Sequence, residues 1–359
     1  MASIQEDRSL ASLEGLRLFA SIAVVASHYC QYLHLSPRGL HLAVDLFFVI
    51  SGIVIAMIYQ GRINDFRSYF GFARKRIARL YPLHFVTLVF YLIIGGVIAT
   101  GRIAPENAEK YNPSEIIPNL LMVHAWSPFG VISYNYVSWS ISAEFFVYLC
   151  FPLILYLMTR GPVVGMAICL ALLLTTIVVS QIVLGNELPE LSWNFGVLRA
   201  VPSFSFGVWL WAFRDKLSKV RLLRTCALPA MTGGMIGLIA IMAIYPNDYL
   251  LLACVYVLAI GAFICDLTGR RTFASWAPIS RHGYLTYSIY MLHTVIATIV
   301  ISFIFPRIFG KSQGAVLAAV ACSAVLTFAV AYASYWYFET PLRSYIGGSR
   351  PPERRAITS

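Results

Sequence analysis

An arginine and a histidine lie on one face of the first apolar stretch, which reads LRLFASIAVVASH over residues 16–28. Arg17 and His28 are eleven residues apart, so on a helix they lie within about 20° of the same face and about 16 Å apart along the axis. A neutral imidazole is the usual general base near pH 7, and a guanidinium binds anions. The pair therefore predicts anion binding beside base catalysis. A purely structural role fits these two residues equally well. In that case Arg17 reaches the water interface and His28 hydrogen-bonds a neighbouring helix.

Two carboxylates fall inside later apolar stretches, where ionisable groups are costly and usually face a partner or a cavity. Asp45 lies in AVDLFFVISGIVI and Glu144 in VSWSISAEFFVYLCFPL. Counting from the helix ends places both acids, with His28, in the outer half of a bilayer. Since an acid can orient a catalytic imidazole, we predict His28, Glu144 and Asp45 as catalytic residues. Asp45 fits a structural acid paired with a histidine or with backbone donors just as well.

A basic cluster precedes the third apolar stretch, in the predicted loop FARKRIARLYP. Arg76 and Arg79 are three residues apart and would share a helix face. Such a cluster anchors membrane topology, or it clamps phosphates, for which the planar arginine fork is suited. Coenzyme A carries such phosphates, so we predict Arg17, Arg76 and Arg79 as the residues that bind this donor.

Other polar residues carry weaker signals. Arg199, at the start of the sixth apolar stretch, either contacts an acceptor or anchors the interface; with Trp139 it is our predicted acceptor-binding pair. Tyr287 and His293 in YLTYSIYMLH are typical of helix packing or of an interfacial aromatic belt. Glu339 in FETPLR suggests a structural cap or ion pair. The seven cysteines show neither CxxC nor metal-ligand spacing, so no metal is predicted.

The elements that must position these residues are membrane helices. Of the 359 residues, 59% are hydrophobic and 12% are charged, against about 25% charged in soluble domains. Apolar runs of about 20 residues predict an all-α polytopic protein with about ten spans. The predicted spans are 16–35, 41–60, 81–100, 137–158, 163–184, 196–213, 226–245, 249–267, 284–305 and 314–337.

Basic residues give the orientation. The formal charge is +11, but the basic residues fall between apolar runs, which is typical of topology signals and not of a nucleic-acid-binding face. Both termini are predicted to be cytoplasmic. The longest outer loop, 101–136, could then cover a site or meet a polar substrate. Of the 27 Lys and Arg residues, the predicted outer segments hold only Arg38, Arg102, Lys110, Arg199, Arg307 and Lys311.

Seven stretches in this order resemble the acyltransferase-3 family of integral membrane acyltransferases, which typically O-acetylate extracytoplasmic or surface carbohydrates. The stretches run from residue 13 to residue 343 and read LEGLRLFASIAVVASH, VDLFFVISGIVI, RKRIARLYP, SWSISAEFFVYLCFPL, RAVPSFSFGVWL, YSIYMLH and FETPLR. The resemblance implies a bacterial enzyme of the cytoplasmic (inner) membrane that transfers groups other than amino-acyl groups. It also implies ten helices, an acyltransferase domain over 1–345 and a cytoplasmic tail over 346–359, which we expect to be disordered.

Carried over residue by residue, the family's arginine-then-histidine motif falls on Arg17 and His28. Its paired arginines fall on Arg76 and Arg79, and its acid falls on Glu144. Many relatives continue into an extra helix and an extracytoplasmic hydrolase-like domain, whereas this sequence stops 16 residues after FETPLR. The expected acceptor site is therefore the membrane domain with its outer loops, or a partner. Members of the family with this shorter form modify exopolysaccharides, lipopolysaccharide O-antigens, Nod factors or macrolides, and the matching motifs are compatible with each of these acceptors.

These features combine into one mechanistic hypothesis. The acyl donor, acetyl-coenzyme A, would bind from the cytoplasm, and its pantetheine arm would reach toward His28. The enzyme is expected to need no permanently bound cofactor and no metal. His28 would act as general base on a hydroxyl of a carbohydrate or glycolipid, or would take the acyl group covalently. Glu144 or Asp45 would orient His28 or bind the sugar. The expected partners are this donor, that acceptor and the lipid bilayer, without nucleic acid.

Two other classes fit part of the sequence. A transporter or flippase of a glycan or small lipid explains ten helices and buried charge, but transporter repeats give internal symmetry, which the sequence does not show. A structural or sensing membrane protein does not account for so many ionisable groups inside apolar stretches.

Overall fold

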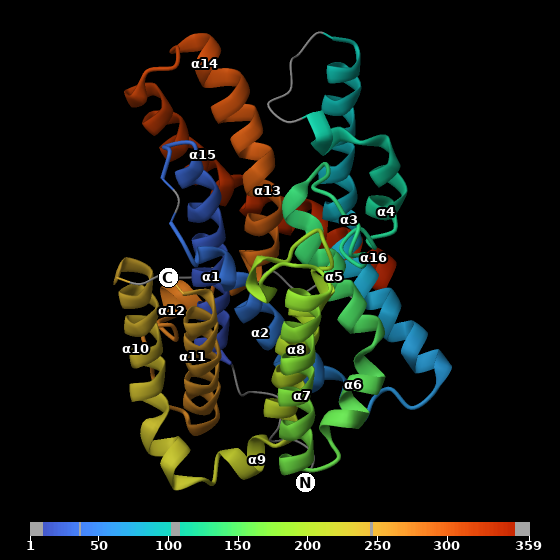
Figure 1. Cartoon of the computed structure of the whole chain (residues 1–359), viewed down its shortest axis with the longest axis vertical. Helices are drawn as coiled ribbons and strands as arrows, with labels where there is room; N and C mark the ends of the chain where they lie inside the picture. The colour runs from blue at the N-terminus through green and yellow to red at the C-terminus, as the bar shows by residue number, and fades with distance from the viewer. Residues whose placement is uncertain (1–9, 36, 102–107, 245–246, 349–359) are drawn as a thin grey trace.

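The computed structural model describes residues 10–35, 37–101, 108–244 and 247–348. Throughout these ranges the regular structure is helical, without a strand, so the predicted all-α class is confirmed (Figure 1). The predicted tail, 346–359, lies outside the described residues beyond Gly348, and its first two residues belong to the last helix.

The first helices carry most of the ionisable residues that the sequence singles out. They are α1 (Ala11–Gln31), α2 (Ala43–Tyr59) and α3 (Phe66–Ala99). Asp65 caps α3, because its carboxylate accepts from the Ser68 backbone N–H at 2.7 Å while the Ser68 side chain bonds back to the cap. α3 therefore begins fifteen residues before the predicted span 81–100. The predicted loop with Arg76 and Arg79 was wrong: both arginines lie on a helix.

The middle of the chain contains a bent pair of helices. α5 (Trp139–Leu149) and α6 (Phe151–Met158) meet at Cys150 with an angle of 64°. The break follows from Pro152 in the first turn of α6, since proline cannot donate the hydrogen bond that would continue α5. The single predicted span 137–158 is thus two helices. Upstream, the short α4 (Ile116–Leu120) lies in the predicted outer loop.

The remaining helices complete the bundle. They are α7 (Pro162–Ile182), α8 (Val197–Ala212), α9 (Arg214–Leu217), α10 (Arg221–Ile244), α11 (Asp248–Thr268), α12 (Ala277–Ser280), α13 (Thr286–Ala297), α14 (Phe305–Ile308), α15 (Gln313–Ser334) and α16 (Thr340–Gly347). A π-helical segment joins α13 to α14, and another joins α15 to α16, so each pair forms one long helix.

Within the part of the chain that the structure describes, seven helical segments are long and apolar enough to cross a membrane, or eight if α5 and α6 form one broken span. Each predicted span overlaps a helix, but α8 has only 16 residues, and α1 is less apolar because it contains Glu14, Arg17 and His28. The described residues therefore support a multi-pass membrane protein with seven or eight such spans. The count of ten and the cytoplasmic location of both termini stay predictions.

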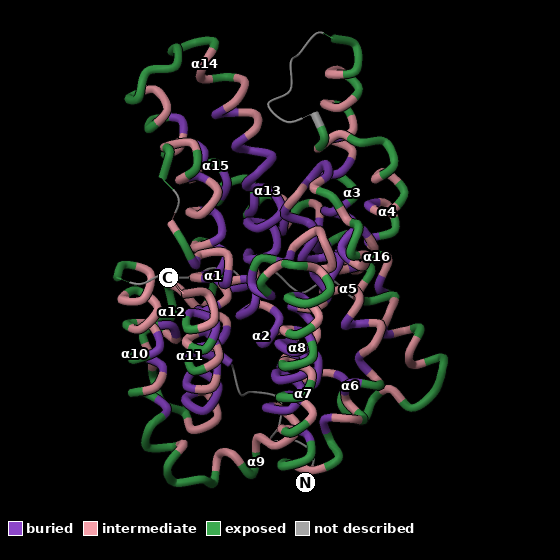
Figure 2. The backbone as a smooth tube through the Cα atoms, viewed as in Figure 1, coloured by how far each residue is buried: buried purple, intermediate pink, exposed green. Residues whose placement is uncertain are grey.

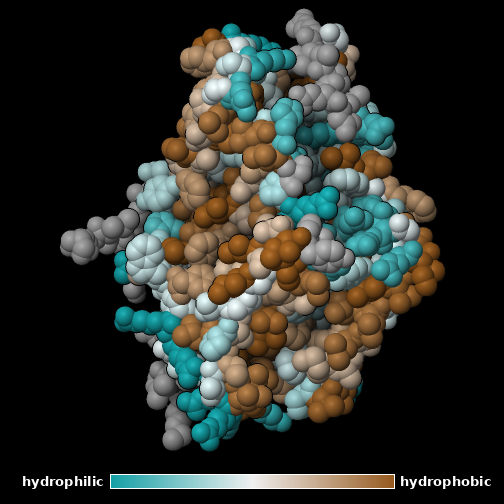
Figure 3. Space-filling view, turned by 60° about the vertical axis from the view of Figure 1, so that its left-hand side comes forward, coloured by the Kyte–Doolittle hydropathy of each residue, from teal (hydrophilic) through white to brown (hydrophobic). Residues whose placement is uncertain are grey.

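The bundle consists of buried inner helices and outer helices with an apolar exposed surface. Buried residues concentrate on α2, α8 and α13 in the centre, whereas α7, α10 and α15 are mostly exposed (Figure 2). The exposed side chains on these outer helices are largely apolar, including Leu174 and Ile239, and apolar side chains dominate the middle of the surface in Figure 3. An apolar exterior around a partly polar interior is the arrangement that a bilayer favours.

α2 and α8 cross in backbone contact. A Cβ on Gly52 would lie 2.2 Å from the carbonyl oxygen of Phe204, and a Cβ on Gly207 would lie 2.0 Å from that of Val49. Only glycine on both helices allows this approach, which is the usual role of small residues between membrane helices. Gly52 and Gly207 are therefore packing residues of the α2–α8 crossing.

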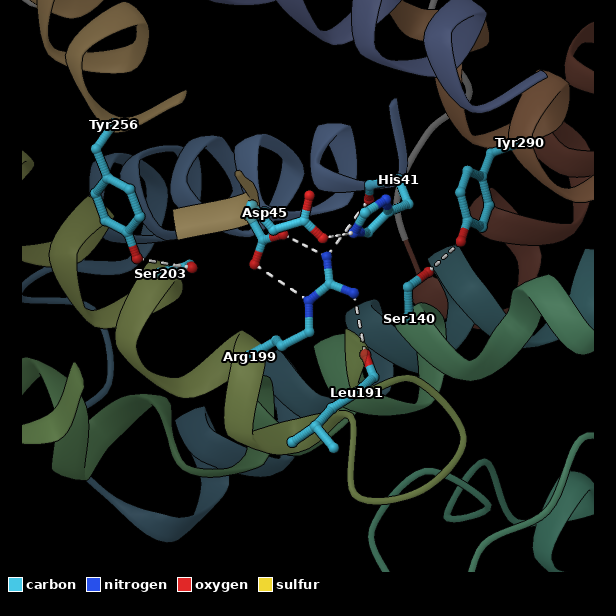
Figure 4. Close-up of polar contacts among 9 residues, drawn as sticks. His41, Asp45, Ser140, Leu191, Arg199, Ser203, Tyr256 and Tyr290 are labelled. Carbon is cyan, nitrogen blue, oxygen red and sulfur yellow. Dashed lines mark hydrogen bonds and ion pairs between the residues drawn. The ribbon is translucent and has the colours of Figure 1, made fainter. Parts of the chain in front are cut away.

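One buried ion pair also joins α2 to α8 (Figure 4). The guanidinium of Arg199 contacts both carboxylate oxygens of Asp45, and both side chains are 3% exposed. Arg199 also donates to the carbonyl oxygens of Leu191 at 3.0 Å and His41 at 3.4 Å, and it lies over the ring of Trp139. The pair is therefore fully enclosed by hydrogen-bond acceptors and an aromatic face, as a buried charge pair requires.

We expect Gly207→Val to lower the free energy of unfolding by about 1–3 kcal/mol or more, because a β-carbon there overlaps a backbone carbonyl. Gly233→Val on α10 is the matched control, since a Cβ at that position meets no atom within 4 Å. Thermal unfolding of the detergent-solubilised protein measures both variants. Equal unfolding midpoints would contradict the close α2–α8 crossing.

We expect Asp45→Asn to destabilise the protein by about 3–5 kcal/mol, because it leaves the Arg199 charge buried without its partner. The double variant Asp45→Leu/Arg199→Met, which removes both charges, should recover part of that loss. The thermal midpoint of each variant gives the comparison. Normal stability of Asp45→Asn together with lost activity would instead assign Asp45 to the chemistry.

Candidate active site

A cavity of about 430 Å³ lies between α1, α2, α3, α5, α13 and α16. Its wall includes one carboxylate, Glu144, and a cluster of basic side chains. We name this cluster the cationic group; its members are Arg17, Lys75, Arg76, Arg79 and Arg343. The structure thus brings together all three arginines predicted to bind the donor, although they come from two helices. It adds Lys75, from the same basic cluster on α3, and Arg343 from α16, neither of which was predicted to bind the donor.

Most of the cationic group lacks an acidic partner. Arg17 pairs with Glu14 one turn away, at 3.2 Å. Across the described residues, the other four members form no ion pair. A set of positive charges that the protein leaves unneutralised beside a cavity favours an anionic ligand, because a ligand can supply the missing countercharge.

Aromatic rings hold the two central arginines. The Arg76 guanidinium pairs with no acid among the described residues, but it donates to the Tyr59 hydroxyl at 3.1 Å and lies 5.2 Å from the centre of that ring. Its buried Nε has no partner among the described residues. Arg79 lies 5.5 Å from the ring centre of Tyr287, whose hydroxyl donates to the carbonyl oxygen of Leu80. Cation–π contact stabilises each guanidinium without neutralising it, so both stay available to a phosphate.

Glu144 faces the same cavity with one of its oxygens already bonded. Its Oε1 accepts from Tyr148 at 2.5 Å and from Ser51 at 2.7 Å, and these two hydroxyls lie 2.8 Å apart. No described residue donates to Oε2. The sequence contained a signal for Tyr148, since residues four apart on a helix face each other. Glu144 therefore contacts hydroxyls from α2 and α5 and forms no hydrogen bond with His28.

His28 lies outside the cavity lining and pairs with a second histidine. Its Nδ1 is 2.8 Å from Nε2 of His293, and Nδ1 of His293 is 2.6 Å from the carbonyl oxygen of Tyr290. The edge of Tyr136 packs against the His28 ring at 5.2 Å. His28 is half-buried, whereas His293 is fully buried. The sequence placed His293 among packing residues and did not anticipate this contact.

Tyr290 connects the cavity to the histidine pair. Its side chain lines the cavity, and its hydroxyl accepts from Ser140 at 2.7 Å and donates to the carbonyl oxygen of Val137 at 2.8 Å. Its ring lies 6.1 Å from that of His293. Tyr290 thus lies between the cationic cavity and His293, and His293 in turn contacts His28.

The predicted acceptor residues lie elsewhere. Arg199 and Trp139 do meet, in cation–π contact at 5.1 Å, but inside the buried ion pair with Asp45. Asp45 contacts Arg199 and not His28. These three predicted site residues therefore form a separate cluster, and Glu339, the predicted cap or ion-pair acid, accepts instead from Ser288 and Ser334. In the described part of the chain, no three His, Cys, Asp or Glu side chains gather in a way that could hold a metal ion.

Comparison with known proteins identifies the family of the chain. A family model described as "Acyltransferase domain" matches residues 10–336. The chain is 38% identical over 168 residues to Acyltransferase MdmB from Streptomyces mycarofaciens, which covers 43% of this chain and 41% of that protein. It is 25% identical over 371 residues to Peptidoglycan O-acetyltransferase OatA from Listeria monocytogenes, which covers 92% of this chain and 55% of that one.

A third relative, Protein 2 in picA locus from Rhizobium radiobacter, is 40% identical over 77 residues, or 21% of this chain and 40% of its own length. The chain thus spans about half or less of the lengths of these relatives. No solved structure matches it. Because the family model covers nearly the whole chain, including α1, the cationic group up to Arg79 and the histidine pair, the chain belongs to the acyltransferase-3 family.

Proposed function

We propose that this protein is a membrane-bound O-acyltransferase that moves the acetyl group of cytoplasmic acetyl-coenzyme A to a hydroxyl of an extracytoplasmic or lipid-linked carbohydrate. The observation that carries the proposal is the cavity that Lys75, Arg76, Arg79 and Arg343 line together while forming no ion pair with any described residue. In an acyltransferase chain, such a space suits a donor that carries several phosphates.

The donor side follows from the chemistry of the cationic group. Coenzyme A has a diphosphate and a 3′-phosphate, and arginine forks bind phosphates through paired hydrogen bonds. Lys75 is exposed, whereas Arg76 and Arg79 are half-buried, so the group leads from the surface into the bundle. The phosphates would bind the cationic group, and the pantetheine arm would extend along the cavity toward Tyr290.

The reaction side is assigned to His28. The acceptor hydroxyl would give its proton to the imidazole while its oxygen attacks the thioester carbonyl; the carbon–sulfur bond then breaks and the proton passes to the thiolate. Alternatively, His28 takes the acyl group first and hands it to the hydroxyl. Glu144, with Oε2 open to the cavity, would bind a donor or acceptor group and not orient His28, since its bonds are to Ser51 and Tyr148.

The acceptor and location are supported by the relatives and by charge. One relative is named a peptidoglycan O-acetyltransferase and another an acyltransferase, which favours a carbohydrate hydroxyl such as that of an exopolysaccharide, an O-antigen or a Nod factor. The distribution of basic residues supports a protein of the bacterial cytoplasmic membrane with both termini inside. Donor and acceptor would then reach the protein from opposite faces.

We expect Arg76→Gln and Arg343→Gln each to weaken coenzyme A binding by about 10- to 100-fold, the equivalent of losing one charge-assisted hydrogen bond. Arg67→Gln is the matched control, because Arg67 is an exposed residue of α3 outside the cavity lining. Titration calorimetry with coenzyme A and with dephospho-coenzyme A measures the affinities. A residue that contacts the 3′-phosphate loses its effect with the second ligand. Unchanged affinities in both variants would refute the cationic group as the donor site.

We expect His28→Ala to reduce acyl transfer by about 10²–10⁴-fold, the range that general acid–base catalysis contributes, while coenzyme A affinity stays unchanged because His28 does not line the cavity. His282→Ala, at an exposed histidine, is the control. Transfer of labelled acetyl from acetyl-coenzyme A to isolated cell glycans gives the rate, and mass spectrometry of glycans from a deletion strain identifies the acceptor. Wild-type transfer by His28→Ala would remove this residue from the mechanism. Glycan movement across vesicles without acyl transfer would support a flippase instead.

A further inference from the structure

Three groups form one continuous hydrogen-bond relay across α1 and α13. The Tyr290 carbonyl oxygen lies 2.6 Å from Nδ1 of His293, and Nε2 of His293 lies 2.8 Å from Nδ1 of His28. The two imidazole planes differ by only 19° and the ring centres are 5.0 Å apart. Nearly coplanar rings joined edge to edge give a hydrogen bond in the ring plane, where the nitrogen lone pair and N–H bond both point.

The relay fixes where the hydrogens are. A carbonyl oxygen only accepts, so Nδ1 of His293 must carry the hydrogen. A neutral imidazole has one N–H, and His293 is fully buried without an ion pair among the described residues, so a charged ring there is disfavoured. Nε2 of His293 is therefore an acceptor, and Nδ1 of His28 must donate to it. In neutral His28, the remaining nitrogen, Nε2, then holds a free lone pair.

We propose that His293 is a positioning residue that holds His28 in the Nδ1-protonated form, so that Nε2 of His28 is the reacting atom. This inference rests on the proposed acyl transfer. In direct transfer, Nε2 takes the hydroxyl proton, the new oxygen–carbon bond forms, the carbon–sulfur bond breaks, and the proton passes from Nε2 to sulfur. Throughout these steps Nε2 of His293 accepts the same Nδ1–H of His28, so no proton passes between the rings.

The covalent route uses the same atom. The bond from Nε2 of His28 to the acyl carbon forms as the carbon–sulfur bond breaks, and the hydroxyl oxygen later displaces Nε2 while its proton ends on the thiolate sulfur. In both routes the imidazole becomes positively charged, and the lone pair of His293 stabilises that charge through Nδ1–H. An orienting acceptor of this kind is commonly a carboxylate, but here Asp45 is bound to Arg199 and Glu144 to two hydroxyls.

The relay is anchored to the wall of the donor cavity. Tyr290 supplies the carbonyl that orients His293, and its side chain, which lines the cavity, makes two hydrogen bonds, one with Ser140 of α5 and one with Val137 in the turn just before α5. The α13 backbone at this point is held further by the Tyr29 hydroxyl, which donates to the His293 carbonyl oxygen at 3.0 Å. The α13 end of the relay is thus held in place, and the hydrogen bond between His293 and Nδ1 of His28 orients the His28 ring.

The direct test is the protonation site of His28 in the unmodified protein. Ring ¹H–¹⁵N correlation spectra of ¹⁵N-histidine-labelled protein in detergent distinguish the two forms, and the His28 signals are those lost in His28→Gln. We expect Nδ1 to carry the hydrogen and Nε2 to be bare at neutral pH. A hydrogen on Nε2 of His28 with Nδ1 bare would overturn the proposal, whether or not any variant folds.

Two variants separate positioning from packing. His293→Leu removes the acceptor at similar volume, and His293→Gln places a carbonyl oxygen where it can still accept from His28. We expect His293→Leu to lower kcat by about 10²–10⁴-fold, the loss that follows from an unoriented base, with coenzyme A affinity unchanged. His293→Gln should recover at least about tenfold of that loss. Thr294→Val, which removes the adjacent buried hydrogen bond to Asn135, is the control and should stay within about twofold of wild type.

Each outcome decides between roles. Equal loss in His293→Gln and His293→Leu at unchanged thermal stability, or a parallel loss of coenzyme A affinity, would make His293 a packing residue and overturn the inference. The proposed function fails separately, when the wild-type protein binds no coenzyme A and transfers no acyl group. In that event the spectra still report whether the relay holds His28 in the stated form.

Discussion

Four positive charges that line one cavity of an otherwise apolar bundle, and that form no ion pair within the described chain, are the constraint on which the rest of the structure depends. None of the four forms an ion pair with a carboxylate of the described chain, although Glu144 lines the same cavity, so other groups must hold them. Aromatic rings do this: Tyr59 and Tyr287 support Arg76 and Arg79 through their faces. Faces of this kind stabilise a cation without cancelling its charge. The bundle therefore keeps an electrostatic attraction that only a bound anion can satisfy.

The apolar runs predicted most of the architecture, because length and hydropathy determine where a chain can cross lipid. They could not predict where helices start or break. The basic residues before the third run read as a loop, yet the Asp65–Ser68 cap starts α3 ahead of them. A capping pair at that spacing was visible in the sequence. The bend at Cys150 follows from a proline that a hydropathy average does not register.

The candidate site was predictable to the extent that its residues share a helix. Arg76 with Arg79, and Arg17 with His28, follow from spacing along one helix. Contacts between distant helices were beyond reach: nothing local indicates that Arg343 joins the cationic group, that Asp45 meets Arg199, or that His293 meets His28. Each of these pairs is separated by at least 150 residues, so tertiary packing alone determines it. For the same reason a role for Asp45 beside His28, reasonable from depth, is not the arrangement that the bundle adopts.

Adjacent residues of α2 serve two different neighbours. Ser51 donates to Glu144 in the cavity, while Gly52, the next residue, presses its backbone against α8. Because α2 cannot shift at Gly52 without shifting at Ser51, packing against α8 also fixes the position of the Ser51 hydroxyl that bonds Glu144. Most of α8 itself lies outside the cavity lining. Substitutions in α8 can therefore change the hydrogen bonding of Glu144 without contacting it. Any redesign of this protein for another substrate must therefore change α2 and α8 together, because the two helices move as one rigid body.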